Sequence, residues 1–154
     1  MIRLLTVGKI KDKALKELID EYTKRINGYT SFKIDEVKDE AIVANNSSEA
    51  IKDKEGERLL ATIKDDEYVI LLDLAGEEMD SIAFSLKLQH VIDHYPKITF
   101  VIGGSLGLSK EVIKRANYRW KLSSLTFLHT MTRLLVCEQI YRAMKINHHE
   151  TYHK

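Results

Sequence analysis

Three glycines within five residues, Gly103, Gly104 and Gly107, directly follow the short apolar run Ile98–Ile102. The run is too short for a helix and rich in β-branched and aromatic residues, which predicts a strand covered on both faces, as in a parallel sheet. Glycine lacks a Cβ atom, so this turn can adopt positive φ and bring its backbone close to a ligand. In open α/β sheets, ligands bind at the carboxyl ends of the strands. We therefore expect a small-molecule site at residues 103–107.

Short apolar runs and stretches of helical periodicity alternate along the whole chain. Strands are expected at residues 2–7, 32–37, 68–74, 98–102 and 118–122, and helices at residues 12–28, 46–63, 80–95, 109–116 and 130–146. This alternation predicts an α/β sandwich with a mostly parallel sheet. With 154 residues and no repeat, linker or low-complexity segment, we expect a single domain over residues 1–154.

Local signals suggest where several of these elements begin and end. Asn46 followed by Glu49 resembles a capping box at the start of the second helix. Gly56 lies inside that helix, within a mixed-charge run expected to be a solvated face, and weakens the expectation that the helix is unbroken. The pair Ala75-Gly76 is expected to form a turn that ends the third strand.

Composition excludes several classes of protein. The 24 basic and 23 acidic residues give a net charge of +1, which neither indicates nor excludes an anionic partner, because a basic patch can lie within a neutral total. The single Cys137 excludes an intramolecular disulfide and a cysteine-based zinc site, as is typical of a reducing compartment. There is no charged-then-apolar leader and no apolar run approaching 18 residues, so we expect a soluble, cytoplasmic protein without membrane contact.

Familiar cofactor and metal motifs are incomplete. The glycine turn has Ile102 where a dinucleotide fingerprint needs its first glycine, and no Gly-Lys-Ser/Thr is present for a P-loop. His90 and His94 have the helical spacing of metal ligands, but Val91 stands where a zincin has its glutamate. Three histidines near the carboxyl end have no carboxylate or cysteine that completes a recognisable set. We expect no metal.

The last predicted helix carries an arginine among its apolar residues. Arg133 lies in the same helical sector as Leu134, Val136, Cys137, Ile140, Tyr141 and Met144. An arginine in that position can bind an anion. The alternative, which spacing alone slightly favours, is that Arg133 caps a neighbouring carbonyl or pairs with Glu138 across an interface. Glu138 and Arg142 are spaced for an ordinary i,i+4 ion pair.

Four separated segments resemble the rRNA large-subunit methyltransferase H family, which is part of the SPOUT superfamily of knotted methyltransferases. They are FVIGGSLGLS at 100–109, LSSLTFLH at 122–129, RLLVCEQIYRA at 133–143 and YHK at 152–154. The similarity extends over the whole chain, in the same order and spacing. The resemblance implies a C-terminal trefoil knot, which general topology rules would not propose, since they treat knots as essentially absent.

The resemblance also implies an activity and its partners. Members use S-adenosylmethionine to methylate N3 of a pseudouridine in the 23S rRNA loop that bridges the ribosomal subunits. They act as homodimers on assembled ribosomes. A largely neutral adenosine suits a cleft of loop backbone and small apolar side chains, without the fixed anion site that a dinucleotide needs.

Site residues follow from the same resemblance, position by position. The residues that match the cofactor cleft are Leu72, Gly103, Leu122, Ser123, Ser124, Leu125, Thr126 and Phe127. The last-helix motif is matched by Arg133, Glu138, Tyr141 and Arg142, and the tail that closes over the site by Tyr152 and His153. We expect His153 to be the general base and Tyr152 to position or accept a proton. Arg142 or Arg133 is expected to steady negative charge on the uracil oxygens. Arg133 and His129 are the expected substrate-binding residues.

The chain departs from the family pattern in two places. Leu128 stands where members commonly have a proline, so the loop lacks a residue that would stiffen its backbone. His148 and His149 replace an Arg-Gly pair, which removes a flexible hinge and a permanent charge and leaves pH-dependent contacts to RNA.

Two other functions fit parts of the pattern. A SPOUT methyltransferase acting on another RNA site would share the glycine turn, but it would not be expected to end in Tyr-His-Lys so soon after the last helix. A flavodoxin-like small-molecule binding module would explain the sheet and the glycine turn and would need no catalytic tail.

Overall fold

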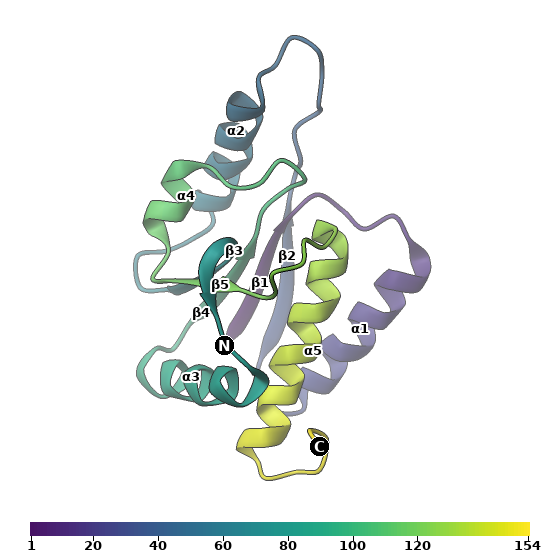
Figure 1. Ribbon diagram of the computed structural model, residues 1–154, viewed down its shortest axis with the longest axis vertical. Helices are drawn as coiled ribbons and strands as arrows, with labels where there is room; N and C mark the ends of the chain where they lie inside the picture. The colour runs from purple at the N-terminus through teal and green to yellow at the C-terminus, as the bar shows by residue number, and fades with distance from the viewer.

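The computed structural model describes residues 1–154 as alternating strands and helices (Figure 1). The strands are β1 (Ile2–Val7), β2 (Phe32–Val37), β3 (Tyr68–Glu78), β4 (Ile98–Ile102) and β5 (Tyr118–Lys121), and the helices are α1 (Lys13–Asn27), α2 (Ser48–Leu60), α3 (Ser81–His94), α4 (Lys110–Arg115) and α5 (His129–Asn147). All strands pair in parallel, in the order β2-β1-β4-β3-β5. The predicted α/β sandwich with a parallel sheet is confirmed.

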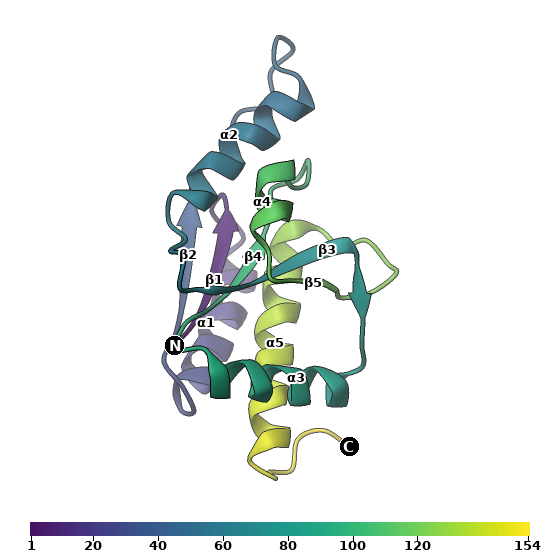
Figure 2. The same ribbon diagram turned by 90° about the vertical axis from the view of Figure 1, so that its left-hand side faces the viewer.

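Helices cover both faces of this sheet. On one face, α1, α3 and α5 pack on a core that includes Leu4, Phe100 and Trp120. On the other face, α2 and α4 pack on a smaller core that includes Leu5 and Val101. Figures 1 and 2 show α1 beside α5 and α2 beside α4. Successive strand residues therefore face different cores, which is why β1 and β4 are apolar throughout. None of the helices combines the length and the apolar character needed to cross a membrane.

Most predicted boundaries agree with the structure, but the capping box of α2 does not. The N-cap of α2 is Ser47, whose Oγ accepts a hydrogen bond from the backbone N–H of Ala50 at 3.1 Å. The prediction of Asn46 as the cap was therefore wrong by one residue. Both side chains can cap a helix, and sequence spacing does not distinguish them.

The predicted turn at Ala75-Gly76 was also wrong, because β3 continues through it to Glu78. The pairing of β3 with β5 shifts register between Leu72 and Glu77. A Cβ atom on Gly76 would lie 2.6 Å from the backbone carbonyl carbon and oxygen of Arg119. The glycine therefore permits close approach of the neighbouring strand β5. In the sequence, a glycine with this packing role cannot be told from a glycine in a turn.

Gly56 has a similar packing role inside α2, which is unbroken. A Cβ atom at this position would lie 2.3 Å from Ser109 Oγ and 3.0 Å from Ser109 Cβ, at the start of α4. Glycine was needed so that α2 could approach α4.

Substitution of Gly56 by alanine is expected to destabilise the protein. Replacing a glycine by alanine in a helix interior usually stabilises the protein by about 0.5–1 kcal/mol. Here the overlap with Ser109 should reverse the sign and lower the free energy of unfolding by about 1–3 kcal/mol. Urea unfolding measures the difference, with Gly28→Ala as the control because Gly28 is exposed and has right-handed helical φ and ψ. A stability gain in Gly56→Ala would contradict the close packing of α2 and α4.

Candidate functional site

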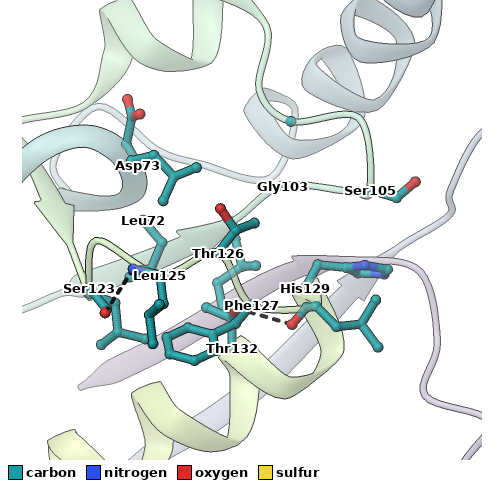
Figure 3. Close-up of a pocket in the computed structure, with 16 residues that line it drawn as sticks. Leu72, Asp73, Gly103, Ser105, Ser123, Leu125, Thr126, Phe127, His129 and Thr132 are labelled. Carbon is teal, nitrogen blue, oxygen red and sulfur yellow. Dashed lines mark hydrogen bonds between the residues drawn. The ribbon is translucent and has the colours of Figure 1, made fainter.

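A cavity of about 490 Å³ opens between the glycine turn after β4 and the loop that leads into α5 (Figure 3). It is lined by residues 72–74, 102–105, 107, 122, 123, 125–129 and 132. Figure 3 shows Leu72 and Ser123 at one end, Leu125 and Phe127 along the loop, and His129 at the other end. The structure thus brings together segments that lie far apart in the sequence.

Seven of the eight residues predicted to bind the cofactor line this cavity: Leu72, Gly103, Leu122, Ser123, Leu125, Thr126 and Phe127. The eighth, Ser124, does not line it, and its Oγ donates a hydrogen bond to Glu78 Oε2 at 3.3 Å instead. The expected location at the glycine turn is therefore where the cavity lies. Ser105, within the expected segment 103–107, lines the wall, and sequence reasoning missed Asp73 and Thr132, which line it too. Their nearness to the end of a strand or the start of a helix was the only signal.

The wall of the cavity is made mainly of backbone and apolar side chains. Its one carboxylate, Asp73, is already paired with Arg119, whose Nη2 lies 2.6 Å from Asp73 Oδ2. The loop is held from within, since the Leu125 N–H donates to Ser123 Oγ and Thr132 Oγ1 donates to the Leu128 carbonyl oxygen (Figure 3). Such a site suits a ligand with a large neutral portion.

The three glycines of the turn have different roles. Gly107 alone has positive φ, at 97°, and a Cβ there would meet no atom within 4 Å. A Cβ on Gly103 would lie 2.8 Å from Leu108 Cδ2, and one on Gly104 would lie 2.5 Å from Glu55 Oε2. The expectation of positive φ thus holds only at Gly107. Close packing within the protein is what requires the other two glycines.

A second hollow, of about 450 Å³, adjoins the first cavity and shares Leu122, Ser123 and Phe127 with it. Its lining also contains His153, from the carboxyl-terminal tail, and Trp120 of β5. Trp120 is buried, and its Nε1 has no hydrogen-bond acceptor. The tail therefore borders a hollow that adjoins the predicted cofactor cleft.

The three residues expected to be catalytic lie together on α5 and the tail. Arg142 pairs with Glu138, and its Nη1 lies 3.2 Å from His153 Nδ1. Tyr152 donates from its hydroxyl to Glu138 Oε1 at 3.1 Å, and the Arg142 guanidinium lies over the Tyr152 ring. Arg142 follows His129 by 13 positions on α5, which places it roughly 20 Å further along the helix. Of the three, only His153 reaches the second hollow.

Protonation in this cluster is set by its hydrogen bonds. Arginine can only donate, so the contact from Arg142 requires an unprotonated Nδ1 on His153 and places the proton of the neutral ring on Nε2. Burial and the hydrogen bond with Tyr22 raise the pKa of Tyr152, which keeps it a neutral phenol. The expectation of Tyr152 as a proton acceptor does not fit this arrangement. His153 can accept a proton at Nδ1 only after it leaves Arg142.

Arg133 is not placed to bind substrate in this structure. Its side chain is 1% exposed, and its Nη1 donates to Glu36 Oε2 at 2.8 Å. Its Nη2 donates to the carbonyl oxygens of Val7 and Gly8, at 2.6 and 2.9 Å. The capping alternative is thus what the structure shows, whereas pairing with Glu138 is wrong because Glu138 pairs with Arg142. Arg133 fixes α5 to the carboxyl end of β1.

His129, the other expected substrate ligand, is the first residue of α5 and borders the first cavity. Its Nδ1 is buried without a hydrogen-bond partner. Burial, and then the nearby charge of Arg133, lower the pKa of His129 and favour the neutral ring. His129 therefore offers its ring as an uncharged hydrogen-bonding group.

Glu55 of α2 is an unexpected buried carboxyl beside the glycine turn. It is 5% exposed, its Oε1 accepts the Glu40 backbone N–H at 3.1 Å, and its Oε2 has no partner. Burial raises the pKa of this carboxyl above its ordinary value of 4.5. The sequence hid Glu55 within the mixed-charge run that was expected to be a solvated helix face.

In the Glu55→Gln variant, the free energy of unfolding should decrease less steeply as pH rises. Above pH 4.5 the unfolded carboxyl loses its proton, whereas the folded one keeps it until its raised pKa is passed. The folded state binds more protons in that window, so Glu55 makes the free energy of unfolding decrease as pH rises through it. Urea unfolding from pH 4.5 upward measures the slope. Glu57→Gln, an exposed neighbour, should keep the wild-type slope, and parallel curves for Glu55→Gln and wild type would contradict the burial effect.

The histidine pairs His90/His94 and His148/His149 contact neighbouring groups of the protein. His94 Nδ1 lies 2.7 Å from the His90 carbonyl oxygen on the exposed side of α3, and no three His, Cys, Asp or Glu side chains are grouped to hold a metal. In the tail, the His148 ring packs on Tyr29. His149 has a φ of 56°, a left-handed conformation that a glycine adopts without strain.

Comparison with known proteins agrees with this geometry. A sequence model of the family described as "Predicted SPOUT methyltransferase" matches residues 1–153. The chain belongs to the SPOUT methyltransferase family. Membership of the SPOUT family implies the expected C-terminal trefoil knot and leaves the flavodoxin-like binding module without support.

Three relatives of similar sequence carry the name ribosomal RNA large subunit methyltransferase H. The relative from Ruminiclostridium cellulolyticum is 49% identical over 159 residues, with 99% of each chain covered. The relative from Desulfitobacterium hafniense strain DSM 10664 is 48% identical over 157 residues, covering 99% of this chain and 98% of its own. One from Exiguobacterium is 47% identical over 158 residues, with 99% of each covered. The predicted resemblance to the rRNA large-subunit methyltransferase H family is confirmed.

Proposed function

We propose that this protein uses S-adenosylmethionine to methylate N3 of a pseudouridine in the intersubunit-bridge loop of 23S rRNA in assembled ribosomes. The observation that carries the proposal is that two hollows adjoin, with Leu122, Ser123 and Phe127 in the walls of both. Predicted cofactor residues line the first hollow, and His153 borders the second. The relatives named above support rRNA as the substrate.

The residues present fit S-adenosylmethionine. The first cavity has the volume of a small-molecule site, and loop backbone and apolar side chains form most of its wall. When bound, this cofactor supplies an activated methyl group on a sulfonium leaving group. Leu72, Gly103 and the loop residues 122, 123 and 125–127 would hold the cofactor and align it. Alignment is the main contribution a protein makes to an in-line displacement.

The tail would act on the nucleobase in the second hollow. With its proton on Nε2, His153 can donate a hydrogen bond to a uracil oxygen and steady the charge that develops as the N3 proton leaves. Once separated from Arg142, the same ring can take up that proton at Nδ1. Arg142 then positions His153 by direct contact, and Tyr152 supports Arg142 through Glu138, which accepts a hydrogen bond from each.

A homodimer would complete the walls of both spaces. Large apolar side chains stand exposed at their rims, including Leu125 and Leu128 at 68% and 67% exposure beside the first cavity. Ile82 is exposed beside the second hollow, and Leu86 lies one turn further along α3. Exposed apolar side chains around a functional cavity fit a protein partner, and we propose a second copy of this chain. Methylation of assembled ribosomes would take place in the cytoplasm.

Transfer of labelled methyl from S-adenosylmethionine tests the function directly. Intact ribosomes, free 23S rRNA and tRNA are compared as acceptors, and the modified nucleotide is mapped by mass spectrometry of RNA fragments. Label at N3 of a pseudouridine in ribosomal 23S rRNA is expected. Label only in tRNA or at another rRNA position would instead indicate a SPOUT enzyme with a different RNA site.

A further inference from the structure

A third cavity, of about 840 Å³, lies on the other side of the glycine turn. It shares Gly104, Ser105 and His129 with the cofactor cavity. Its other walls come from the carboxyl ends of β1 and β2 and from the loop 38–42, where Val37, Ala41 and Ile42 provide apolar surface. None of the roles assigned above uses this space, apart from that of His129.

Two residues that line this cavity, Glu55 and His129, each carry a buried hydrogen-bonding atom without a partner. Glu55 Oε2 and His129 Nδ1 are both inaccessible to solvent and unpaired in the structure. Burying such groups without partners is costly, so native proteins seldom keep them unless a ligand or water completes them. Glu55 is the stronger of the two observations, because the whole residue is 5% exposed.

Unpaired lysines surround the opening. Lys9, Lys11 and Lys38 line the cavity, are exposed, and form no ion pair within the protein. Two acids of the lining are engaged elsewhere, Glu36 with Arg133 and Glu40 with Arg58. Asp39 and the buried Glu55 are the lining acids without an ion pair, against three lysines. The free charge around the opening is therefore positive, although the net charge of the whole chain is +1.

We propose that this third cavity binds a nucleotide of the substrate RNA other than the one that is methylated. The inference rests on the proposed function. Lysines at the rim would contact the phosphate, which contributes affinity without sequence information, and the unpaired Glu55 oxygen would accept an N–H from the base edge. The apolar wall at Ile42 would pack on the base. A strand held here passes the glycine turn beside the cofactor cavity, which would fix the target nucleotide at the methyl group.

Two other ligands of this cavity need to be considered, a metal ion and the cofactor. No group of three His, Cys, Asp or Glu side chains is present to hold a metal ion. The amino-acid portion of the cofactor, with its ammonium group, remains a competitor for Glu55, and the experiments below separate it from RNA.

Kinetics of Glu55→Gln provide the first test. Glutamine keeps an oxygen for the Glu40 N–H but replaces the free acceptor by an NH₂ donor, which would face the donor of the base. We expect the KM for ribosomes to rise about tenfold, as for one lost hydrogen bond, with kcat and the Kd for S-adenosylmethionine unchanged. Glu57→Gln is the control with the same charge change. An unchanged KM, or weakened cofactor binding instead, would overturn the proposal.

The rim lysines are tested by the salt dependence of binding. The triple variant K9Q/K11Q/K38Q should bind ribosomes more weakly and lower the slope of log K against log salt by about 0.7 for each lost phosphate contact. The control K24Q/K64Q/K114Q removes the same charge from exposed, unpaired lysines outside the cavity. Equal slopes in the two triple variants would contradict phosphate contact at this rim.

A binding experiment without catalysis separates this inference from the proposed function. Amide chemical shifts are followed as nucleoside 5′-monophosphates are added to the protein saturated with S-adenosylhomocysteine. We expect shifts at Lys38, Ile42 and Ser105 that Glu55→Gln abolishes, whether or not 23S rRNA proves to be the methyl acceptor. Shifts confined to residues 122–127 would overturn the nucleotide site while leaving the methyltransferase function intact.

Discussion

Deletion of Tyr152, His153 and Lys154 is expected to lower single-turnover methyl transfer at saturating cofactor by about 10²–10⁴-fold, the range of general acid–base and charge-stabilising contributions. His153 is the only predicted catalytic residue that borders the space next to the cofactor cavity. The cofactor cavity itself contains no tail residue. Cofactor affinity, measured by calorimetry, should therefore be largely retained.

The deletion also removes packing, which has to be measured separately. Tyr152 lies against Tyr141, with ring centroids 5.0 Å apart, and is hydrogen-bonded to Glu138. Losing these contacts should reduce the free energy of unfolding by about 1–2 kcal/mol, too little to unfold most of the protein. Glu150 stays in place, so its pair with Lys145 is kept. Deleting Lys154 alone is the matched control.

The single substitution His153→Ala identifies the chemical role within the tail. If His153 takes up the N3 proton, His153→Ala should change the shape of the pH–rate profile, because the pH-dependent contribution of a general base is lost. If His153 only donates from Nε2, the rate should drop without a change in the shape of the pH profile. Full activity of His153→Ala at every pH would remove it from the mechanism.

The structure could be predicted best from the sequence at positions where a single physical requirement determines the residue type. A buried parallel strand followed by glycines located β4, its turn and the cofactor cavity, because continuous apolar runs and missing Cβ atoms have few other uses. Gly76 was misjudged because its requirement comes from the backbone of Arg119, 43 positions away in the sequence. Such a contact leaves no local pattern.

Glu55 shows a second limit of sequence reasoning. Within KDKEGER every residue but Gly56 is charged, and the usual reading of such a run is a solvated helix face. Only the tertiary packing of α2 against the glycine turn turns Glu55 inward, toward Gly104. The resemblance to the family supplied the loop 122–127 and the tail. It could not show that Arg133, although it lies in a matched motif, donates its hydrogen bonds to Glu36, Val7 and Gly8 of the same chain.

Arg133→Met is expected to destabilise the protein by about 3 kcal/mol, in the range for removing one partner of a buried, hydrogen-bonded charge. Methionine fills similar volume but leaves the carbonyl oxygens of Val7 and Gly8 without their donor. It also leaves Glu36 without its cation, although partial exposure of that carboxylate lets water compensate in part. Chemical unfolding measures the loss.

Arg142→Met is the matched comparison that separates a structural arginine from one that positions the catalytic tail. Arg142 pairs with Glu138 at i,i+4 on a partly exposed face, and such pairs contribute about 0.3–0.5 kcal/mol. We expect Arg142→Met to lose little stability but much methyl transfer, because His153 loses the donor that fixes its tautomer. Arg133→Met should do the reverse, with kcat/KM per folded molecule near wild type. If Arg133→Met instead kept its stability and raised the KM for ribosomes, Arg133 would be a substrate ligand after all, and the tie between α5 and β1 would have to open when RNA binds.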